Sequence, residues 1–443
     1  MASTELKRTI SSAGSQTKWG ASAWVKRCDL GLSAGVYCSS KSDTTQNNRG
    51  IFFNSSDQIE CAFYNGGYTY QVVTNRLFRD TSAFYHVVVN LDTSQTTAAD
   101  RIKIWVNGVQ ETSFATSNYP GQGSTHNFLG TDITQLVASL REGSSIHHSC
   151  IIAHLHFTDG YCYPASTFGE TDATTGIWKP KISPSGVTYG TNGFFLKFDN
   201  SANMGLDSAG SNNLTTSSGT IIQSKETPSN IFCNLNLLNR INEYSITNVG
   251  STFTNISSGN HRMTAGTLAA SSGKYYAEVK VVAVGGTYPQ IGIIDPGLYA
   301  YDSHLGNSNK GYGYLSNGNK QVNGTATSFG NSYTDGDIIG IAMDLDNSKL
   351  YFSKNGTFQN SGVPTSGSTG TGAIAFTAGS VYTFGQSAYN SGTFSWNFGN
   401  GFFGTSAVAS AQSPDDGTGV FEYDVPAGYR ALCTKSINEE EYS

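Results

Sequence analysis

Two segments of the chain share one pattern, which consists of a strand, an acidic Leu-Asp step, a second strand and an Asn-Gly turn. The clearer copy is DGDIIGIAMDLDNSKLYFSKNGTF, residues 335–358, and the other spans residues 85–110. In the clearer copy every second residue is apolar, at Ile339, Ile341, Met343 and Leu345. This alternation is typical of a β-strand with one face in a core. Asn355 and Gly356 tolerate the positive φ angles of a tight hairpin turn. The recurrence predicts two related β-sandwiches in series.

Length and composition support two domains of the all-β class. The chain has 443 residues, more than one hydrophobic core usually supports. Only 13% of the residues are charged and 51 are glycine, so the polar surface is built from Ser, Thr, Asn and Gly. The only stretch with a helical pattern is short, TQLVASLR at residues 134–141. We therefore expect two jelly-roll β-sandwiches in tandem, with one short helix at residues 134–141.

Charge, hydropathy and cysteine content exclude several classes of partner and setting. The net charge is −6 and no basic run occurs, so we expect no nucleic-acid partner. No window approaches the ~18 apolar residues of a membrane span, and the first 20 residues lack the apolar core of a signal peptide, so we expect no membrane insertion. Seven scattered cysteines without a CxxC pair indicate reduced thiols in a protein made in a cytoplasm.

The boundary between the domains falls in a turn-rich stretch, SANMGLDSAGSNNLTTSSGTIIQSKETPSN, at residues 201–230. Pro228 stands near its end, and a Pro-containing polar stretch is a common place for a linker. We place the first domain at residues 1–227, the second at residues 228–434 and a solvated acidic tail at residues 435–443.

Motifs in both halves resemble known families. SSGKYYAEVKV, KGYGYLSNGNK, the segment at residues 335–358 and FSWNFG resemble a SPRY domain in their order. WGASAWVKR and the segment RDTSAFYHVVVNLDTSQTTAADRIKIWVNGVQ resemble a concanavalin A-like, laminin-G-like sandwich. GLDSAGSNNLT, TPSNIFCNLN and VPAGYRALCTKSI are similar to phrases in virion proteins of tailed bacteriophages. The resemblance implies sandwiches that bind ligands through loops at the strand ends, glycans in the first domain and peptides or protein surfaces in the second.

One departure from the first family concerns the edge of the first sheet. Only MASTELK precedes RTISSAG, so the usual extra strand is missing or very short. An open sheet edge can pair with another chain. We expect a possible homo-oligomer, with a trimer favoured, formed through this edge or through the sandwiches themselves.

Catalytic motifs are missing from the sequence. The ExDxxE pattern of retaining glycoside hydrolases is absent, and its nearest imitation is Glu170 with Asp172 in a turn-rich stretch. No GxSxG, HExxH or GxxxxGK[ST] motif occurs. We therefore expect no enzyme activity and read the Glu170–Asp172 pair as part of a turn.

The only cluster with metal-binding residue types contains histidines: His147, His148, His154 and His156, with Cys150 nearby. His154 and His156 share one strand face by alternation, so they are candidates for a ligand pair. The spacing supplies no third ligand, and a polar exterior explains the pair better. Calcium at Asp199, Asn200 and Asp207 is conceivable, but turn formation explains these residues better. We expect no cofactor.

Two loops have the composition of a ligand-binding surface. Sugar recognition uses an aromatic platform with amide and carboxylate hydrogen bonds. One loop of this kind holds Tyr299, Tyr301, Asp302, His304 and Asn307, and the other, YNGGYTY, holds Tyr64, Tyr68 and Tyr70. The alternative for each loop is that its tyrosines only cover the rim of a sandwich.

The leading hypothesis is a non-enzymatic virion surface protein, made in the host cytoplasm and exposed on the particle as a tail fibre or decoration. Its expected partners are other virion proteins and a host cell-surface glycan or protein. The alternative is a purely structural capsid or tail decoration or adaptor that binds other virion proteins. A third hypothesis, a polysaccharide-degrading enzyme, has no motif in its favour.

Overall fold

The structure is a computed structural model of the full chain. The residues that it describes are 4–41, 46–142, 150–174, 176–219, 221–239, 244–248, 250–256, 259–286, 288–298, 300 and 302–441. The chain divides into two compact units, residues 1–223 (unit 1) and 224–443 (unit 2). The domain boundary at residue 227 stays a prediction beside this division.

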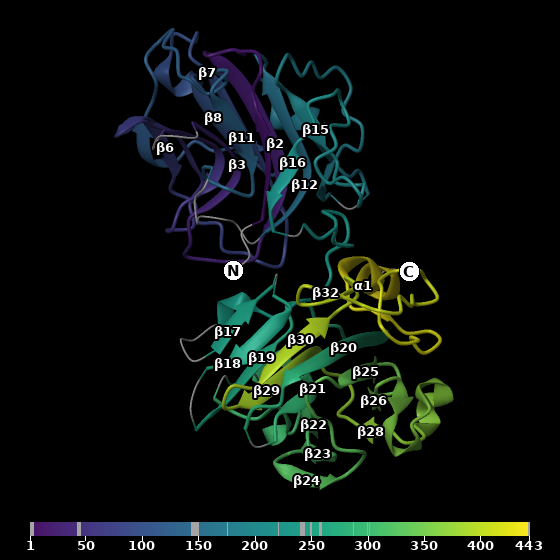
Figure 1. Ribbon diagram of the computed structural model, residues 1–443. Helices are drawn as coiled ribbons and strands as arrows, with labels where there is room; N and C mark the ends of the chain where they lie inside the picture. Colours follow the sequence, from purple (N-terminus) through teal and green to yellow (C-terminus); the bar gives the residue numbers. More distant parts are fainter. Residues whose placement is uncertain are drawn as a thin grey trace. The chain divides into compact units, whose positions relative to one another are not determined.

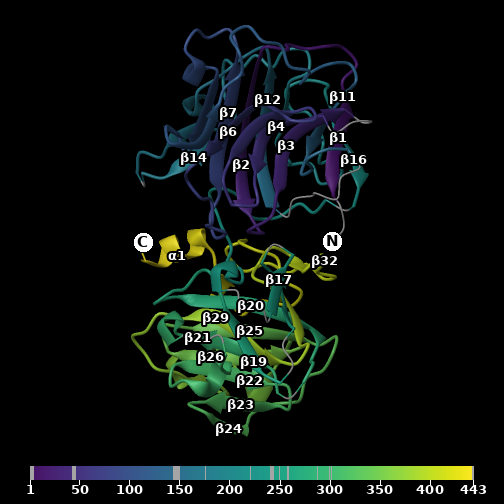
Figure 2. The same ribbon diagram turned by 90° about the vertical axis from the view of Figure 1, so that its left-hand side faces the viewer.

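Unit 1 is a β-sandwich of two antiparallel sheets (Figures 1 and 2). The eight-stranded sheet has the order β10 (Phe114–Asn118), β6 (Tyr68–Thr74), β5 (Glu60–Tyr64), β4 (Asn47–Phe53), β3 (Ala34–Lys41), β11 (Ile133–Val137), β1 (Glu5–Thr9) and β16 (Thr215–Ser218). The six-stranded sheet has the order β15 (Phe194–Leu196), β12 (Cys150–Asp159), β2 (Lys18–Arg27), β7 (Tyr85–Asp92), β8 (Ile102–Val106) and β9 (Val109–Gln110).

Unit 2 is a second β-sandwich, which confirms the all-β expectation for both halves. Its nine-stranded sheet has the order β17 (Tyr244–Thr247), β18 (Thr252–Asn255), β30 (Thr393–Asn397), β20 (Lys274–Ala283), β25 (Ile338–Asp344), β26 (Lys349–Lys354) and β27 (Thr357–Phe358), with β28 (Ile374–Ala375) beside β26 and β33 (Arg430–Ala431) beside β20. Its six-stranded sheet has the order β19 (His261–Ala265), β29 (Thr383–Tyr389), β21 (Gln290–Ile294), β22 (Gly311–Leu315), β23 (Asn319–Val322) and β24 (Thr325–Ser328).

The remaining elements are small. Two hairpins stand outside the large sheets, β13 (Gly169–Thr171) with β14 (Trp178–Pro180) and β31 (Phe402–Phe403) with β32 (Ser406–Ala407). The 3₁₀ helices are Ala98–Asp100, Ala165–Thr167, Leu237–Asn239, Pro296–Leu298, Leu305–Asn307, Gln359–Ser361 and Pro364–Thr369. The α-helix is α1 (Thr434–Glu441). No helix in the described part of the chain is long and apolar enough to cross a membrane.

The repeated pattern forms the predicted hairpins, β25–β26 in unit 2 and β7–β8 in unit 1. The side chains predicted to share a face, Ile339, Ile341, Met343 and Leu345, all lie in the core of unit 2. Both Asn-Gly turns have positive φ at both residues, 48° and 80° at Asn355 and Gly356 and 49° and 83° at Asn107 and Gly108. The turn prediction is therefore confirmed.

One aspartate of each repeated pattern has the same structural role, Asp92 of the Leu91–Asp92 step and Asp344 directly before the Leu345–Asp346 step. Asp92 lies opposite Lys18 of β2, and its carboxylate is 3.0 Å from the lysine nitrogen. Asp344 lies opposite Lys274 of β20, at 3.4 Å. Each aspartate also accepts a backbone N–H from the turn that follows, from Ser94 at 3.1 Å and Asn347 at 2.9 Å. These carboxylates therefore stabilise the scaffold of each sandwich.

Two expectations about the eight-stranded sheet of unit 1 are wrong. Residues 133–137 form strand β11 between β3 and β1, where a short helix was predicted, because pairing on both sides outweighs the local helical pattern. The edge beside β1 is also not open, because β16 pairs with β1. The proposed pairing of another chain at this edge therefore loses its structural basis.

A third correction concerns β12, where the register shifts between Ala153 and His156 and His154 has φ 47°. This bulge reverses the alternation in the first half of the strand. Cys150 and Ile152 pack against the core there, in place of the predicted Ile151 and Ala153. Leu155 and Phe157 lie in the core as predicted.

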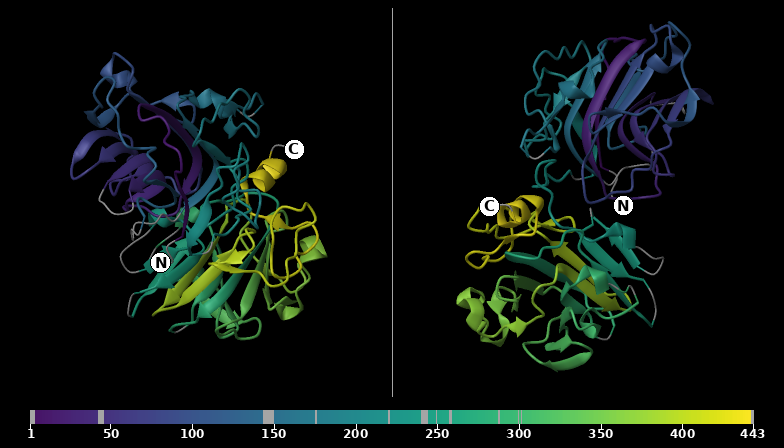
Figure 3. Two further views of the ribbon diagram at one scale, coloured as in Figure 1. Left: turned by 45° about the horizontal axis from the view of Figure 1, so that its top comes forward. Right: turned by 180° about the vertical axis from the view of Figure 1, so that it is seen from behind.

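Each sandwich has an outer sheet face that is covered by irregular chain. In unit 1, Ala165 and Phe168 pack on Val88 of β7, with Trp178 beside them. In unit 2, Phe421 and Tyr429 pack on Tyr276 of β20, and the yellow segment that contributes them runs over the sandwich in Figure 3. In α1, Ile437 packs against the core of unit 2, and Glu439 pairs with Arg430 at 2.9 Å; the tail boundary at residue 435 stays a prediction.

Candidate functional site

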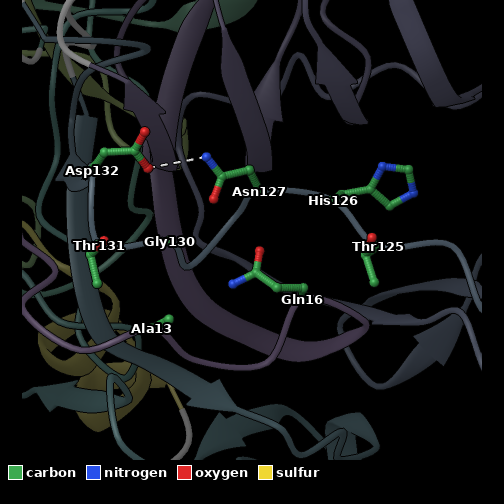
Figure 4. Close-up of a pocket in the computed structure, with 8 residues that line it drawn as sticks. All are labelled: Ala13, Gln16, Thr125, His126, Asn127, Gly130, Thr131 and Asp132. Atoms are coloured by element: carbon green, nitrogen blue, oxygen red, sulfur yellow. Dashed lines mark hydrogen bonds between the residues drawn. The ribbon is translucent and has the colours of Figure 1, made fainter.

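One end of unit 1 carries an open polar hollow of about 660 Å³ (Figure 4). The connections before β2 and before β11 form it. Its lining residues are Ala13, Gln16, Thr125, His126, Asn127, Gly130, Thr131 and Asp132. Between them, Phe128 and Leu129 are buried in the core, and the Phe128 ring stacks on Trp19 at 4.5 Å. The apolar pair anchors the loop and leaves its polar neighbours at the rim. We call Gln16, His126, Asn127 and Asp132 the amide hollow.

Asn127 is held in one position. Its carbonyl oxygen accepts hydrogen bonds from the side-chain amides of Gln46 and Asn48, both at 3.2 Å. Its side-chain nitrogen donates to Asp132 Oδ1 at 3.1 Å, as Figure 4 shows. Gly130 allows this placement, because a Cβ there would lie 2.0 Å from Asn127 Oδ1. The Asn127–Asp132 pair is therefore preorganised.

The charge in the hollow is balanced locally. Asp132 Oδ2 is 2.7 Å from the Lys41 ammonium, and this lysine, with Asn127, lowers the pKa of the Asp132 carboxyl. His126 is buried against the rings of Phe63 and Tyr70, and burial lowers its pKa, so its imidazole is neutral at pH 7. The hollow thus offers amide and carboxylate hydrogen-bonding groups without a net cationic field.

The Tyr64–Tyr70 hairpin lies at the same end of the sheet. Tyr64 ends β5 and pairs with Asn47, which begins β4, whereas Lys41 ends β3 and pairs with Ile133, which follows Asp132. In antiparallel strands these positions all fall at one end of the sheet. The hairpin and the amide hollow therefore share a rim.

A bulge separates the three predicted tyrosines. The register shifts between Phe63 and Tyr64, so that Tyr64 pairs with Tyr68 and Phe63 pairs with Tyr70. The rings of Tyr64 and Tyr68 meet edge to face at 5.3 Å, and Tyr68 is 42% exposed. Tyr70 is fully buried in the core, so its proposed role in ligand binding is wrong. We call Tyr64 and Tyr68 the tyrosine pair.

Arg49 supports the tyrosine pair. Its guanidinium donates to the Tyr68 hydroxyl at 3.0 Å, and its Cζ lies 5.3 Å from the Tyr68 ring centre. It also pairs with the buried carboxylate of Glu60, which accepts a bond from Gln71 at 3.2 Å. These contacts fix the Tyr68 ring as a half-exposed platform.

The candidate loop of unit 2 is described only in part. Tyr299 and Tyr301 lie outside the described residues. Asp302 and Asn307 are exposed, and the His304 ring stacks on His261 with centres 4.0 Å apart. His261 in turn contacts the Tyr389 ring at 5.0 Å. The ligand-binding role of this loop stays a prediction.

His154 and His156 have packing contacts. The His156 ring stacks on Phe195 at 3.8 Å, and its Nδ1 is 2.8 Å from the Tyr189 hydroxyl. The His154 ring lies 5.8 Å from the same phenylalanine. His147 and His148 lie outside the described residues. Within the described ranges, no group of three or more His, Cys, Asp or Glu side chains is arranged to hold a metal ion.

The acidic residues considered for catalysis or calcium are engaged by the chain itself. The Lys179 ammonium lies 2.7 Å from Asp172 and 3.9 Å from Glu170, across the β13–β14 hairpin. Asp207 accepts backbone N–H groups from Phe195, Ala209 and Asn212 at 2.9 Å each. These contacts support the reading of both sets as parts of turns.

Sequence reasoning missed the amide hollow. Its residues come from two loops more than 100 positions apart, and neither loop has an aromatic or charged motif. The stretch HNFLGTD, residues 126–132, contains one pattern that could have indicated the site: polar residues and a glycine surround an apolar pair. Only the pairing of β1 with β11 brings this stretch beside Gln16.

The comparisons with known proteins identify a family for each unit. A family model described as the concanavalin A-like lectin/glucanases superfamily matches residues 7–140, and a SPRY domain model matches residues 274–387. No curated protein matches the chain in sequence.

Solved structures of SPRY domains are similar to part of the chain. The SPRY domain of human HERC1 is 18% identical, with 34% of this chain and 91% of that chain covered and a TM-score of 0.28. A human SPRY domain is 15% identical, with 35% and 94% covered and a TM-score of 0.27. Stonustoxin is 13% identical, with 37% and 27% covered and a TM-score of 0.28. By the two family matches, the chain combines a concanavalin A-like domain in unit 1 with a SPRY domain in unit 2.

Proposed function

We propose that this chain is a non-enzymatic surface protein of a tailed-bacteriophage virion, a tail fibre or decoration that recognises a glycan on the host cell. The two family matches, to the concanavalin A-like lectin/glucanases superfamily and to a SPRY domain, suggest a binding or recognition role. The observation that carries the glycan proposal is the amide hollow, with the preorganised Asn127–Asp132 pair beside a half-exposed tyrosine pair.

The chemistry of the hollow fits a ligand rich in hydroxyl groups. An amide both donates and accepts hydrogen bonds, and a carboxylate accepts them. A sugar hydroxyl can donate to or accept from these groups, so it can bind to both. Gln16 lines the hollow, and its Oε1 has no hydrogen-bond partner among the described residues; because this oxygen is shielded from solvent, a ligand would reach it only after the side chain turns. Lys41 neutralises Asp132, which favours a neutral saccharide over a phosphate-bearing ligand.

The tyrosine pair supplies the apolar complement. Sugar rings present C–H groups on one face, and aromatic rings with a polar edge bind such faces. Arg49 fixes Tyr68, which lowers the side-chain entropy lost on binding. The hollow and the tyrosine pair thus provide the two kinds of contact that saccharide recognition needs.

The virion setting rests on the phage-like phrases of the sequence and on its low charge. In this setting unit 2 binds another virion protein or a host protein through the loop that contains Asp302, His304 and Asn307. A homotrimer is the proposed assembly, formed by the sandwiches and not by the β1 edge. The assembly is tested by measuring the mass of the purified chain in solution and the mass of the same protein released from particles without detergent.

The test of the glycan proposal measures binding of the purified chain to host cells and to their isolated surface polysaccharide. Asn127→Ala and Asp132→Ala should each weaken polysaccharide binding at least about tenfold, because each removes a hydrogen-bonding group worth about 1.4 kcal/mol or more. Tyr68→Ala should weaken it by a similar factor. Asn75→Ala is the matched control, since Asn75 is exposed at the opposite end of the same sandwich and should leave binding unchanged.

Three other outcomes would overturn the proposal. Stoichiometric copurification with virions without any binding to host surfaces would establish a structural decoration or adaptor. Release of reducing sugars from host polysaccharide would establish an enzyme. Binding that survives all three substitutions would place the glycan site elsewhere.

A further inference from the structure

The covering segment of unit 1 is attached through a buried histidine. Hairpin β13–β14 places Trp178 over the outer sheet face, where its indole Nε1–H donates to His86 Nδ1 at 3.0 Å. The other ring nitrogen of His86, Nε2, is 2.9 Å from Ser22 Oγ. Because an indole nitrogen only donates, Nδ1 of His86 carries no proton. His86 is therefore neutral, with its proton on Nε2 and donated to Ser22.

The fit around this hydrogen bond is close. A Cβ on Gly108 would lie 2.9 Å from the Trp178 ring, and one on Gly169 would lie 2.5 Å from it, so the indole occupies space that two glycines leave. The His86 ring stacks on Trp24 at 4.7 Å and is fully buried. The hairpin is thus seated by one tryptophan over one histidine.

The hairpin belongs to neither large sheet. Its strands β13 and β14 pair only with each other, so no backbone ladder joins them to the sandwich. The contacts that attach it include the Trp178–His86 hydrogen bond, the packing of Phe168 on Val88 and the contact of the Phe168 ring with His156. Such a segment can separate while the two sheets stay intact.

We propose that unit 1 contains an acid-sensitive latch, in which neutral His86 holds hairpin β13–β14 on the sheet and protonated His86 releases it. Protonation of His86 Nδ1 would place a second N–H donor opposite the indole N–H. The hydrogen bond that holds Trp178 would then be lost. The imidazolium would also be buried. Among the described residues no acidic side chain contacts the His86 ring, which leaves the buried charge uncompensated.

The titratable neighbours favour the same direction. His154 and His156 of β12 interact electrostatically with His86, and Lys26 follows Trp24 on the same face of β2. On the hairpin, Lys179 engages both Glu170 and Asp172. Burial, with a smaller effect from His154, lowers the pKa of His86 to about 3. Burial likewise lowers the pKa of His156, whose bond to Tyr189 holds the far end of the covering segment.

The expected size of the effect follows from linkage. A histidine exposed by opening has a pKa near 6.5, whereas the closed form holds it near 3, so acid favours the open form. Between pH 7 and pH 4.5 the ratio of open to closed latch should rise on the order of 100-fold. The opening should be reversible, because the closed form is favoured again when the pH returns above about 6.5.

Hydrogen exchange of the full chain, read by mass spectrometry and corrected for the intrinsic effect of pH, tests the latch. Peptides within residues 160–192 should lose protection as the pH falls from 7 to 4.5, while peptides of β2 and β7 keep theirs. Acrylamide quenching of tryptophan fluorescence should rise in parallel, since Trp24 is only 3% exposed in the closed form.

Variants assign the sensor. His86→Gln keeps a hydrogen-bonding amide but cannot titrate, so its hairpin should show no acid transition. If that variant fails to fold, Trp178→Phe should show hairpin exchange at pH 7 and a weaker pH response. His261→Gln is the control, because it removes a half-buried histidine of unit 2 and should leave residues 160–192 unchanged.

Three results would overturn the proposal: unchanged protection of residues 160–192 at pH 4.5, loss of protection in β2 and β7 together with the hairpin, or the same acid transition in His86→Gln as in the unsubstituted chain. A transition abolished by His156→Gln and not by His86→Gln also overturns it, because the sensor would then be the other histidine.

Discussion

Gly356 connects the β25–β26 hairpin to the C-terminal covering segment of unit 2. It has φ 80°, and a Cβ at this position would lie 2.7 Å from the Tyr423 ring. Gly356→Ala should therefore destabilise unit 2 in two ways. A side chain in the left-handed region costs roughly 1–2 kcal/mol. Contact with the ring adds about 1 kcal/mol or more, because overpacking forces neighbours to move.

Tyr423 cannot move freely, which supports the second contribution. Its backbone N–H donates to Glu278 at 2.9 Å, and the preceding residue, Glu422, donates to the same carboxylate at 2.8 Å. Displacing the Tyr423 ring therefore strains the segment that covers β20. The total expected loss in the free energy of unfolding is about 2–3 kcal/mol.

Gly336 provides a matched control for the cost of placing a side chain on a left-handed backbone. It has φ 90°, but nothing lies within 4 Å of a Cβ built there. Gly336→Ala should cost only the roughly 1–2 kcal/mol of the left-handed backbone. Urea unfolding of both variants in the full chain measures the difference in the transition of unit 2. Equal losses would show that Tyr423 turns aside without cost. Lost glycan binding with an unshifted transition would refute the assignment of this hairpin to the scaffold.

Three further predictions concern buried polar groups. Burial raises the pKa of the Glu278 carboxyl to about 7, above its usual 4.5. Unit 2 should therefore lose about 3 kcal/mol in its free energy of unfolding as the pH rises from 4.5 to 7. In urea titrations Glu278→Gln should remove most of this dependence of stability on pH. Tyr70→Phe should stabilise unit 1 by about 1 kcal/mol in thermal unfolding, because the buried hydroxyl has no hydrogen-bond partner among the described residues; a destabilised variant would reveal a partner. Burial raises the pKa of the Cys162 thiol to about 12, and its sulfur lies 3.3 Å from both Trp19 O and Leu91 O, which share its one hydrogen. Alkylation of Cys162 at pH 8 should therefore be slow until the chain is denatured, and rapid labelling of Cys162 in the native chain would contradict this.

The sequence predicted the strands well where only one face of the strand packs against a core. In β20, Tyr275, Ala277 and Val279 lie in the core as their alternation indicates. Glu278 lies on the opposite face, and it too is fully buried, because the C-terminal segment that contains Glu422 covers it. Period-two patterns report a single buried face, so they cannot reveal a third layer of chain.

Bulges are the second limit. A single extra residue exchanges the two faces of a strand, and this happened in β12 at His154 and in the β5–β6 hairpin beyond Phe63. The second bulge decides which tyrosine can meet a ligand, because it turns Tyr68 outward and leaves Tyr70 in the core. Nothing in YNGGYTY distinguishes these two tyrosines locally. Their division depends on the partner strand.

The candidate site itself depends on pairing between distant strands. Gln16 lies in one hollow with Asn127 because β1 lies beside β11, and Lys41 reaches Asp132 because β3 lies on the other side of β11. The hairpins with their Asp92 and Asp344 carboxylates and Asn-Gly turns hold the two sandwiches in shape, but they do not specify the chemistry of the loops. Substitutions in the loops should therefore change ligand binding with little change in stability, and substitutions in the repeated hairpins should do the reverse. The contrast between Asn127→Ala and Gly356→Ala measures this division in one protein.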